Sequence, residues 1–212
     1  MPDNTLTIAL RETKVPPPDD YTEFPDIADG QTIPRQFQEI CRRFPRNLAL
    51  SGPEKSFTYQ ELDRTTDHLA QSVMRHGLRP GERIAVIGHT GPDTVVALLA
   101  ALKCGAIVVP IDPFYPDLRN AEIVKCARAS LAIAADGDTV KAAALGFSAE
   151  QIIDPKQSYQ KELAWDIPLP EVLHKDTCWL IFTSGSTGRP KGVALTHKSM
   201  LHVCMRRSRL LR

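Results

Sequence analysis

The sequence contains no long apolar run and no strong excess of charge of one sign. A bilayer-spanning helix needs at least about 18 consecutive apolar residues, and no stretch of this chain reaches that length. Lys and Arg number 26 and Asp and Glu number 25 among 212 residues, so the formal net charge is +1. These two absences argue against a membrane span and against a globally basic nucleic-acid binder. We therefore expect neither a membrane nor a nucleic acid among the partners.

Signals for secretion and for paired cysteines are also missing. The first 20 residues lack the basic start, the apolar stretch and the small-residue cleavage site of a signal peptide. The chain has five cysteines, an odd number, and no Cys-x-x-Cys pair occurs. This pattern predicts free thiols in a reducing compartment, and hence a location in the cytoplasm.

What is present is an ordinary globular composition, with 42% hydrophobic and 24% charged residues. A chain of this length buries about 70% of its unfolded surface, which is enough for one sizeable core. The charge is unevenly distributed along the chain. Residues 177–212 contain seven basic residues and no acidic residue, whereas residues 1–176 carry a net charge of −6. The asymmetry favours an anionic ligand near the C-terminal end.

Apolar strands and amphipathic helices alternate along most of the chain. Residues 1–31, with three consecutive prolines, predict an extended arm, and the folded unit is expected over residues 32–212. Strand, helix and strand succeed one another within about 27 residues, which indicates a parallel βαβ unit. The sequence predicts an α/β fold whose largely parallel sheet has helices on both faces. The expected strands are residues 48–50, 83–87, 106–109, 131–135, 151–153, 178–182 and 193–196, and the expected helices cover residues 33–44, 92–103, 117–128 and 138–146, with others starting after Thr58 and near His197.

Two helices have features that can be checked in detail. Thr58 followed by Glu61 predicts a capping box, and Gly77 suits the left-handed position after the helix end. For the helix over residues 92–103, the periodicity predicts that the larger apolar side chains face the core. These side chains are Val95, Leu98, Leu99 and Leu102.

The segment Thr183–Gly192 (TSGSTGRPKG) carries the most chemical information. It combines three glycines, four side-chain hydroxyls and one lysine in ten residues. Glycines let the backbone approach a ligand closely, successive N–H groups form an anion-binding nest, and a lysine adds a point charge suited to phosphate. The spacing does not match the Walker A loop, which requires G-x-x-x-x-G-K-[ST]. The alternative interpretation is a flexible hairpin tip. The candidate phosphate-binding residues are Thr183, Ser184, Gly185, Ser186, Thr187, Gly188 and Lys191.

Three segments in order resemble a known family. IFTSGSTGRPKGVALTH closely resembles the phosphate-loop motif of the adenylate-forming superfamily, which includes acyl-CoA synthetases, luciferases and nonribosomal peptide synthetase adenylation domains. Residues 57–73 and 101–119 are similar to two further motifs of that superfamily. The string Pro110-Ile111-Asp112-Pro113-x-Tyr115-Pro116 favours the amino-acid-activating branch. The resemblance extends over residues 32–205.

This resemblance implies a reaction in two halves. A carboxylate attacks the α-phosphate of Mg-ATP to give an acyl-adenylate and pyrophosphate, and the acyl group then passes to a phosphopantetheine thiol. The implied partners are ATP with Mg²⁺, an amino acid or other small carboxylate, and a carrier (thiolation) domain that bears the phosphopantetheine. The seven candidate residues between Thr183 and Lys191 are then expected to hold the β- and γ-phosphates and to neutralise charge on the leaving pyrophosphate.

The chain also departs from the family pattern. The later motifs of the superfamily, which carry its catalytic residues, have no counterpart before Arg212. We therefore expect no catalytic residue within these 212 residues. The chain is expected to be the N-terminal part of an adenylation domain, truncated and inactive alone. Two alternatives stay open: a fragment of an acyl-CoA synthetase-type ligase, and a non-catalytic nucleotide-binding or interaction module.

Other conspicuous side chains receive structural interpretations. His197 and His202 are five residues apart, which does not place them on one helix face, so no metal pair is expected. Cys126 and Cys178 lack a nearby base and are predicted to be small buried apolar residues. Asp112 is interpreted as structural for the proline-rich turn that follows a strand.

Overall fold

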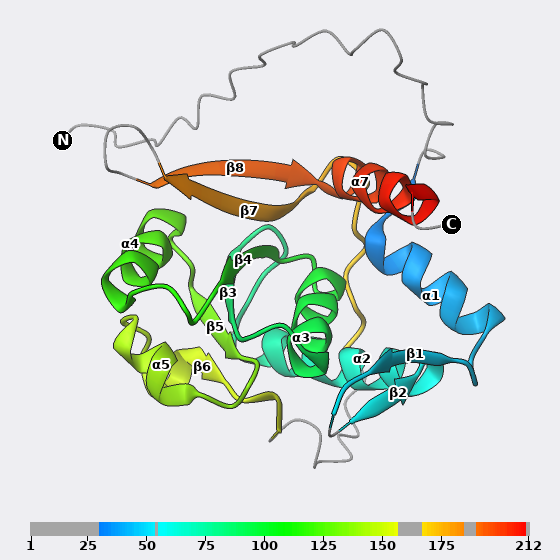
Figure 1. The fold of residues 1–212 in the computed structure, drawn as a ribbon, viewed down its shortest axis with the longest axis horizontal. Helices are drawn as coiled ribbons and strands as arrows, with labels where there is room; N and C mark the ends of the chain where they lie inside the picture. The colour runs from blue at the N-terminus through cyan, green and yellow to red at the C-terminus, as the bar shows by residue number, and fades with distance from the viewer. Residues whose placement is uncertain (1–29, 54, 157–166, 185–189, 211–212) are drawn as a thin grey trace, which may run out of the picture.

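The strands form one six-stranded sheet of mostly parallel order. The computed structural model describes residues 30–53, 55–156, 167–184 and 190–210. The strand order is β6-β5-β3-β4-β7-β8, in which only the pair β7–β8 is antiparallel. The predicted α/β fold with a largely parallel sheet is confirmed (Figure 1). The strands are β3 (Arg83–Ile87), β4 (Ile107–Ile111), β5 (Leu131–Ala134), β6 (Ile152–Ile153), β7 (Thr177–Ser184) and β8 (Pro190–Thr196).

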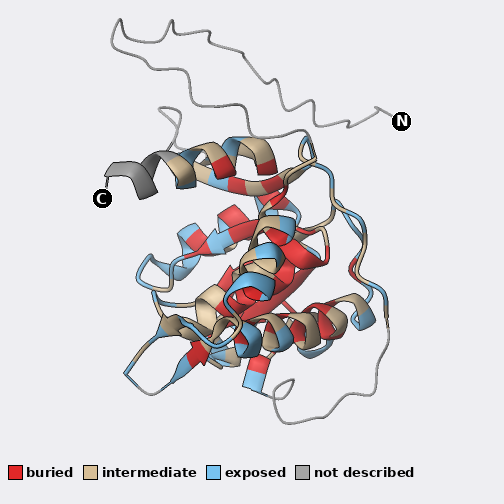
Figure 2. Ribbon diagram, turned by 90° about the vertical axis from the view of Figure 1, so that its right-hand side faces the viewer, coloured by how far each residue is buried: buried red, intermediate tan, exposed pale blue. Residues whose placement is uncertain are grey.

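Helices cover both faces of the parallel strands. Alternate residues of a strand point to opposite faces. In β3, Ile84 and Val86 join the core under helices α2 and α3, whereas Ala85 and Ile87 join the core under α4 and α5. Figure 2 shows the buried residues concentrated in the strands and on the inward sides of the helices. The four helices are α2 (Tyr59–Arg75), α3 (Pro92–Lys103), α4 (Asp117–Ala127) and α5 (Thr139–Ala144).

The remaining elements frame the sheet. Helix α1 (Ile33–Arg43) follows the N-cap Thr32, helix α7 (His197–Leu210) follows β8, and a 3₁₀ turn covers Ala149–Gln151. Strands β1 (Leu48–Ser51) and β2 (Ser56–Thr58) form a separate antiparallel hairpin. Strand β2 was not predicted, because it has only three residues and ends at the cap of α2. Within the described parts of the chain, no helix is long and apolar enough to cross a membrane.

The predicted capping features are confirmed, and the predicted inward face of α3 is confirmed in part, because Leu102 is buried and Leu98 and Leu99 pack against the core. The side chain of Thr58 accepts a hydrogen bond from the backbone N–H of Glu61, the Glu61 carboxylate accepts from the Thr58 N–H, and Gly77 has φ +91°. In α3 the small residues are buried, and Val95, Leu98 and Leu99 are only half-buried. Helix α3 packs closely against both the sheet and α2, and that close approach requires small side chains such as alanine.

A buried lysine joins helices α1, α2 and α3. The Nζ of Lys103 lies 2.6 Å from carboxylate oxygens of Asp63 and Asp67 and donates to the Asp63 carbonyl oxygen at 3.0 Å. The same Nζ lies 5.3 Å from the ring centroid of Phe37 on α1. The Lys103 side chain is 1% exposed, whereas the two aspartates are 30% and 35% exposed. The ammonium group is therefore desolvated, and its two carboxylates still reach water.

This asymmetry predicts unequal effects of removing either sign of charge. The double variant Asp63→Asn/Asp67→Asn leaves a buried ammonium without a counter-charge and should lower the free energy of unfolding by about 3–5 kcal/mol. Lys103→Met leaves two partly hydrated carboxylates and should lower it by about 1–3 kcal/mol. Urea unfolding followed by circular dichroism measures both values. Equal losses, or a larger loss for Lys103→Met, would contradict the assignment of the ammonium as the desolvated partner.

A buried histidine connects the start of α7 to the start of α1. His197 is 1% exposed, and its Nδ1 accepts a hydrogen bond from the backbone N–H of Ile33 at 3.4 Å. Burial lowers the pKa of His197 to about 4 from the ordinary value of 6.5, against the opposing influence of the Asp176 carboxylate. The imidazole is therefore neutral in the folded chain near neutral pH.

The lowered pKa of His197 predicts a loss of stability on the acid side of neutrality. Below about pH 6.5 the unfolded chain binds a proton that the folded chain does not bind until about pH 4. The free energy of unfolding should therefore fall across that window, by on the order of 3 kcal/mol from this residue. Urea midpoints at several pH values should fall more steeply for the unmodified chain than for His197→Asn, whose amide oxygen can accept the same hydrogen bond. Parallel pH curves would refute the role of His197.

Candidate functional site

Strands β7 and β8 form an antiparallel hairpin that carries three of the seven predicted phosphate-binding residues, Thr183, Ser184 and Lys191. In its register Thr183 lies opposite Lys191 and Ser184 opposite Pro190. Thr183 and Lys191 are both exposed, and Thr183 Oγ1 donates to the Lys191 carbonyl oxygen at 3.5 Å. Ser184 ends strand β7. The other four candidates, Gly185, Ser186, Thr187 and Gly188, lie outside the described residues.

The end of this hairpin at which Ser184 pairs with Pro190 lies at the carboxyl edge of the sheet. Strand β7 runs parallel to β4, and β4 runs parallel to β3, so their carboxyl ends share one edge. Open α/β sheets bind ligands outside that edge. Lys191 makes no ion pair with any side chain in the described part of the chain. Its ammonium group is therefore available to an anion.

The antiparallel direction of β8 separates the basic residues that are close in sequence. Strand β8 returns to the amino edge, where Thr196 lies opposite Thr177 and helix α7 begins. Seven residues of extended chain span about 20 Å. Lys191 and the first turn of α7, which contains Lys198, therefore lie at opposite ends of the hairpin, and these two lysines do not form one continuous site.

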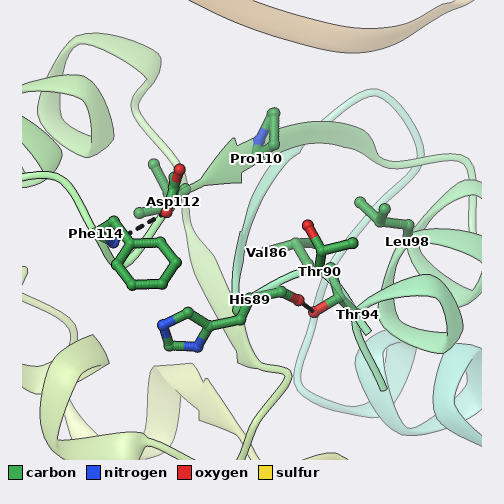
Figure 3. A pocket seen from close by; sticks show the side chains of 10 residues that line it. Val86, His89, Thr90, Thr94, Leu98, Pro110, Asp112 and Phe114 are labelled. Atoms are coloured by element: carbon green, nitrogen blue, oxygen red, sulfur yellow. Dashed lines mark hydrogen bonds between the residues drawn. The ribbon is translucent and has the colours of Figure 1, made fainter. Parts of the chain in front are cut away.

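A second feature of the carboxyl edge is a cavity of about 280 Å³ beyond the ends of β3 and β4 (Figure 3). Helix α3 follows β3 on one face of the sheet, and helix α4 follows β4 on the other face. The chain leaves β3 toward β4 and leaves β5 toward β6 in the opposite direction, so the strand order reverses between β3 and β5, and doubly wound sheets bind ligands at such positions. The lining residues are Val86, Gly88, His89, Thr90, Thr94, Leu98, Pro110, Ile111, Asp112 and Phe114.

Hydrogen bonds and one ring contact join the loops that surround the cavity. Asp136, after β5, accepts a hydrogen bond from the His89 backbone N–H at 2.7 Å, and its Oδ2 lies 2.6 Å from His89 Nδ1. The His89 ring contacts Phe114 edge-to-face, with centroids 4.7 Å apart. Thr94 Oγ1 donates to the His89 carbonyl oxygen at 2.5 Å (Figure 3). Together these contacts fix the loop after β3 to its neighbours.

Asp112 confirms its predicted structural role. Its Oδ1 accepts from the Phe114 N–H at 2.9 Å, and its carbonyl oxygen accepts from Asn120 Nδ2 at 2.9 Å, so it fixes the turn after β4. The cavity lining contains no Lys or Arg, so the cavity itself lacks the cation that suits a phosphate. Sequence reasoning missed His89 and Asp136. The available signal was that each follows a buried strand at its carboxyl end.

The remaining candidates for chemistry do not form a site. The described residues hold no group of three His, Cys, Asp or Glu side chains that could bind a metal ion. Cys178 is buried as predicted, but Cys126 is exposed on α4, so that prediction was wrong. Helix α4 buries Ile123, Val124 and Ala127 instead, and position 126 falls on its outer side. Burial raises the pKa of the Cys178 thiol to about 12, which disfavours a nucleophilic thiolate.

Comparison with known proteins identifies the family. The sequence pattern of the AMP-binding enzyme family matches residues 37–210. The chain belongs to the AMP-binding enzymes. Among the AMP-binding enzymes, surfactin synthase subunit 2 of Bacillus subtilis (strain 168) is 32% identical over 187 residues, which cover 84% of this chain and 5% of that protein. Tyrocidine synthase 1 of Brevibacillus parabrevis is 30% identical over 177 residues, which cover 83% of this chain and 16% of that protein.

Solved structures extend this assignment to the fold. The N-terminal subdomain of Klebsiella oxytoca NpsA in complex with 3-hydroxyanthranilyl-AMSN is 28% identical, with a TM-score of 0.67. The match covers 79% of this chain and 41% of that structure. An artificially fused adenylation–PCP di-domain from the same organism, NpsA-ThdA, is 27% identical with a TM-score of 0.70, covering 81% of this chain and 34% of that one. The chain is thus an N-terminal adenylation-domain region, and it spans well under half the length of these relatives.

The close packing beside the cavity gives a testable prediction for Gly88. A Cβ there would lie 2.6 Å from Thr94 Oγ1 and 2.8 Å from the Cβ of Ala135, whereas a Cβ on Gly91 meets nothing within 4 Å. Gly88→Ser should therefore lower the free energy of unfolding by about 1–3 kcal/mol. Gly91→Ser is the matched control and should be neutral or stabilising, because serine is favoured at the N-cap of α3. Similar urea midpoints for the two variants would contradict the predicted clash.

Proposed function

We propose that this chain forms the N-terminal part of an ATP-dependent, amino-acid-activating adenylation domain. Residues 32–212 then belong to the adenylation domain, residues 1–31 are an arm that precedes it, and the chain is inactive alone. The observation that carries the proposal is the pairing of Thr183 with Lys191 near the end of the hairpin. The glycine- and hydroxyl-rich segment lies between these two residues in the sequence. Family membership supports the nucleotide, because the matched family is that of AMP-binding enzymes.

The proposed role of the hairpin is to hold the β- and γ-phosphates of ATP. Lys191 supplies a positive charge at the carboxyl edge, and Thr183 supplies a hydroxyl from the facing strand. Ser184, Gly185, Ser186, Thr187 and Gly188 complete the proposed set. Charge builds up on the pyrophosphate as a carboxylate attacks the α-phosphate, and cations and hydrogen-bond donors placed there in advance lower the barrier.

Amino acids are the proposed substrates because two lines of support agree. The Pro110-Ile111-Asp112-Pro113-x-Tyr115-Pro116 string favours that branch, and similar proteins include surfactin and tyrocidine synthases. The proposed acceptor is the phosphopantetheine thiol of a carrier domain, by analogy with the adenylation–PCP fusion NpsA-ThdA. We assign no protein ligand of Mg²⁺ to the described residues, which hold no suitable cluster of side chains.

The test is substrate-dependent ATP–pyrophosphate exchange. A chain that continues this segment through the rest of an adenylation domain should exchange pyrophosphate with at least one member of a panel of amino acids and hydroxy acids, and the 212-residue chain should not. Lys191→Ala in the longer chain should lower the exchange rate about 100-fold. Lys175→Ala, which removes an exposed lysine before β7, should change it less than about twofold.

Other outcomes of the exchange assay would contradict different parts of the proposal. Equal losses for Lys191→Ala and Lys175→Ala would remove the proposed role of Lys191. Coenzyme A-dependent release of AMP with fatty or aryl acids, without exchange on amino acids, would assign the domain to acyl-CoA ligases. No exchange with any carboxylate would leave a non-catalytic nucleotide-binding module.

A further inference from the structure

Two side chains of β7 occupy the space beside Gly192 on β8. In the register Gly192 lies directly opposite Phe182, next to the pair formed by Thr183 and Lys191. A Cβ on Gly192 would lie 3.1 Å from Cδ1 of Leu180 and 3.3 Å from Cε1 and Cζ of Phe182. Carbon atoms in ordinary contact lie about 3.5–4.0 Å apart. The leucine and the phenylalanine ring therefore already fill the place of a side chain at position 192.

Space, and not backbone conformation, explains the glycine at this position. Six described glycines have a positive φ, and Gly192 is not one of them. A glycine inside a strand otherwise marks a site where another group approaches the backbone closely. Here that group is the ring of Phe182 on the neighbouring strand. Aromatic rings that pack across a glycine of the facing strand compensate for its missing side chain.

The ring of Phe182 also joins this end of the hairpin to the core under α4. Leu180 is buried and belongs to that core, and Phe182 packs against it. Helix α4 lies beside the end of the hairpin where β7 ends and β8 begins (Figure 1). The next pair along the hairpin, Thr183 and Lys191, is exposed. Phe182 is therefore the last large apolar side chain of β7 before the proposed phosphate-binding residues.

The contact between Phe182 and Gly192 constrains the backbone of Lys191. Lys191 and Gly192 are joined by one planar peptide bond, so a displacement of the glycine moves the lysine with it. Glycine has more conformational freedom than any other residue, and the ring on one face of it restricts that freedom. Because side chains alternate along a strand, Lys191 points to the face opposite the ring, away from α4.

We propose that Phe182 is a positioning residue for the phosphate-binding lysine. Its ring packs on Gly192 and holds the backbone of Lys191 where the ammonium group meets the charge of the leaving pyrophosphate. Neither Phe182 nor Gly192 contacts the nucleotide, and both act through Lys191. The inference deepens the proposed function and rests on it for the catalytic consequence, whereas the packing of the ring on the glycine rests on the contacts between β7 and β8.

Amide hydrogen exchange in the 212-residue chain, followed by NMR, tests the packing. Phe182→Ala should speed the exchange of the hydrogen-bonded amides among residues 182–184 and 191–193 at least about tenfold, because the ring no longer restrains this end of the hairpin. Leu145→Ala is the matched control, since Leu145 is buried in the same core at the end of α5. The control should also lower the thermal midpoint, but without a selective effect on these amides. Unchanged exchange in Phe182→Ala would overturn the proposal.

A double-variant cycle in the longer chain, which continues this segment through the rest of an adenylation domain, tests the catalytic consequence. Phe182→Ala should lower the rate of ATP–pyrophosphate exchange about tenfold when Lys191 is present. In the Lys191→Ala background it should lower the rate less than about twofold, because the residue through which the ring acts is gone. Phe182→Leu keeps an apolar contact and should lose less than about threefold. Leu145→Ala should change the rate by the same factor in both backgrounds.

The two measurements separate this inference from the proposed function. Equal losses from Phe182→Ala in the two backgrounds would show that the ring only supports the fold, and the positioning role would be refuted. If the unmodified longer chain showed no ATP–pyrophosphate exchange with any carboxylate, the proposed function would fail, and the catalytic consequence with it. The packing of Phe182 on Gly192 would then stand or fall by the amide hydrogen exchange alone.

Discussion

A parallel sheet must be shielded from water on both faces, and this requirement determines most of the architecture. Each crossover between parallel strands needs a helix, and the helices here are distributed over the two faces. The strands are accordingly apolar at successive positions, as in the buried Ile84–Ile87 of β3. The same requirement places α3 and α4, which follow the neighbouring strands β3 and β4, on opposite faces of the sheet, and a cavity lies beyond the ends of these two strands.

Polar contacts fix the relative positions of neighbouring helices and loops. Helices α2 and α3 come together through small residues, and Lys103 joins them through Asp63 and Asp67. Replacing buried ion pairs by apolar groups is often neutral or stabilising, so this cluster is best viewed as fixing the relative position of three helices. At the carboxyl edge, Asp136 has a comparable role, because it connects the loop after β5 to the loop after β3 through His89.

The sequence was sufficient to predict the strands of the main sheet, the helices and the fold class, because each buried strand is a short apolar run bounded by turn residues. It was insufficient where packing decided the outcome. The fuller burial of Val96 and Ala97 than of Leu98 and Leu99 depends on how closely α3 meets its neighbours, which periodicity does not encode. The basic C-terminal segment favoured an anionic ligand near that end, but the antiparallel direction of β8 places Lys191 and the first turn of α7 at opposite ends of the hairpin. The contact between His89 and Asp136 joins residues 47 positions apart, so no local sequence pattern predicts that contact.

The ladder between β7 and β8 also constrains how this segment can change in evolution. Side chains in a strand alternate between faces, so a one-residue insertion or deletion in β8 between Lys191 and Ala194 would turn one of these two side chains to the opposite face. Changes of residue type are tolerated at many positions of such a hairpin, whereas changes of length within the paired strands are not. Related sequences should therefore align across Thr177–Ser184 and Pro190–Thr196 without gaps, even where their residues differ.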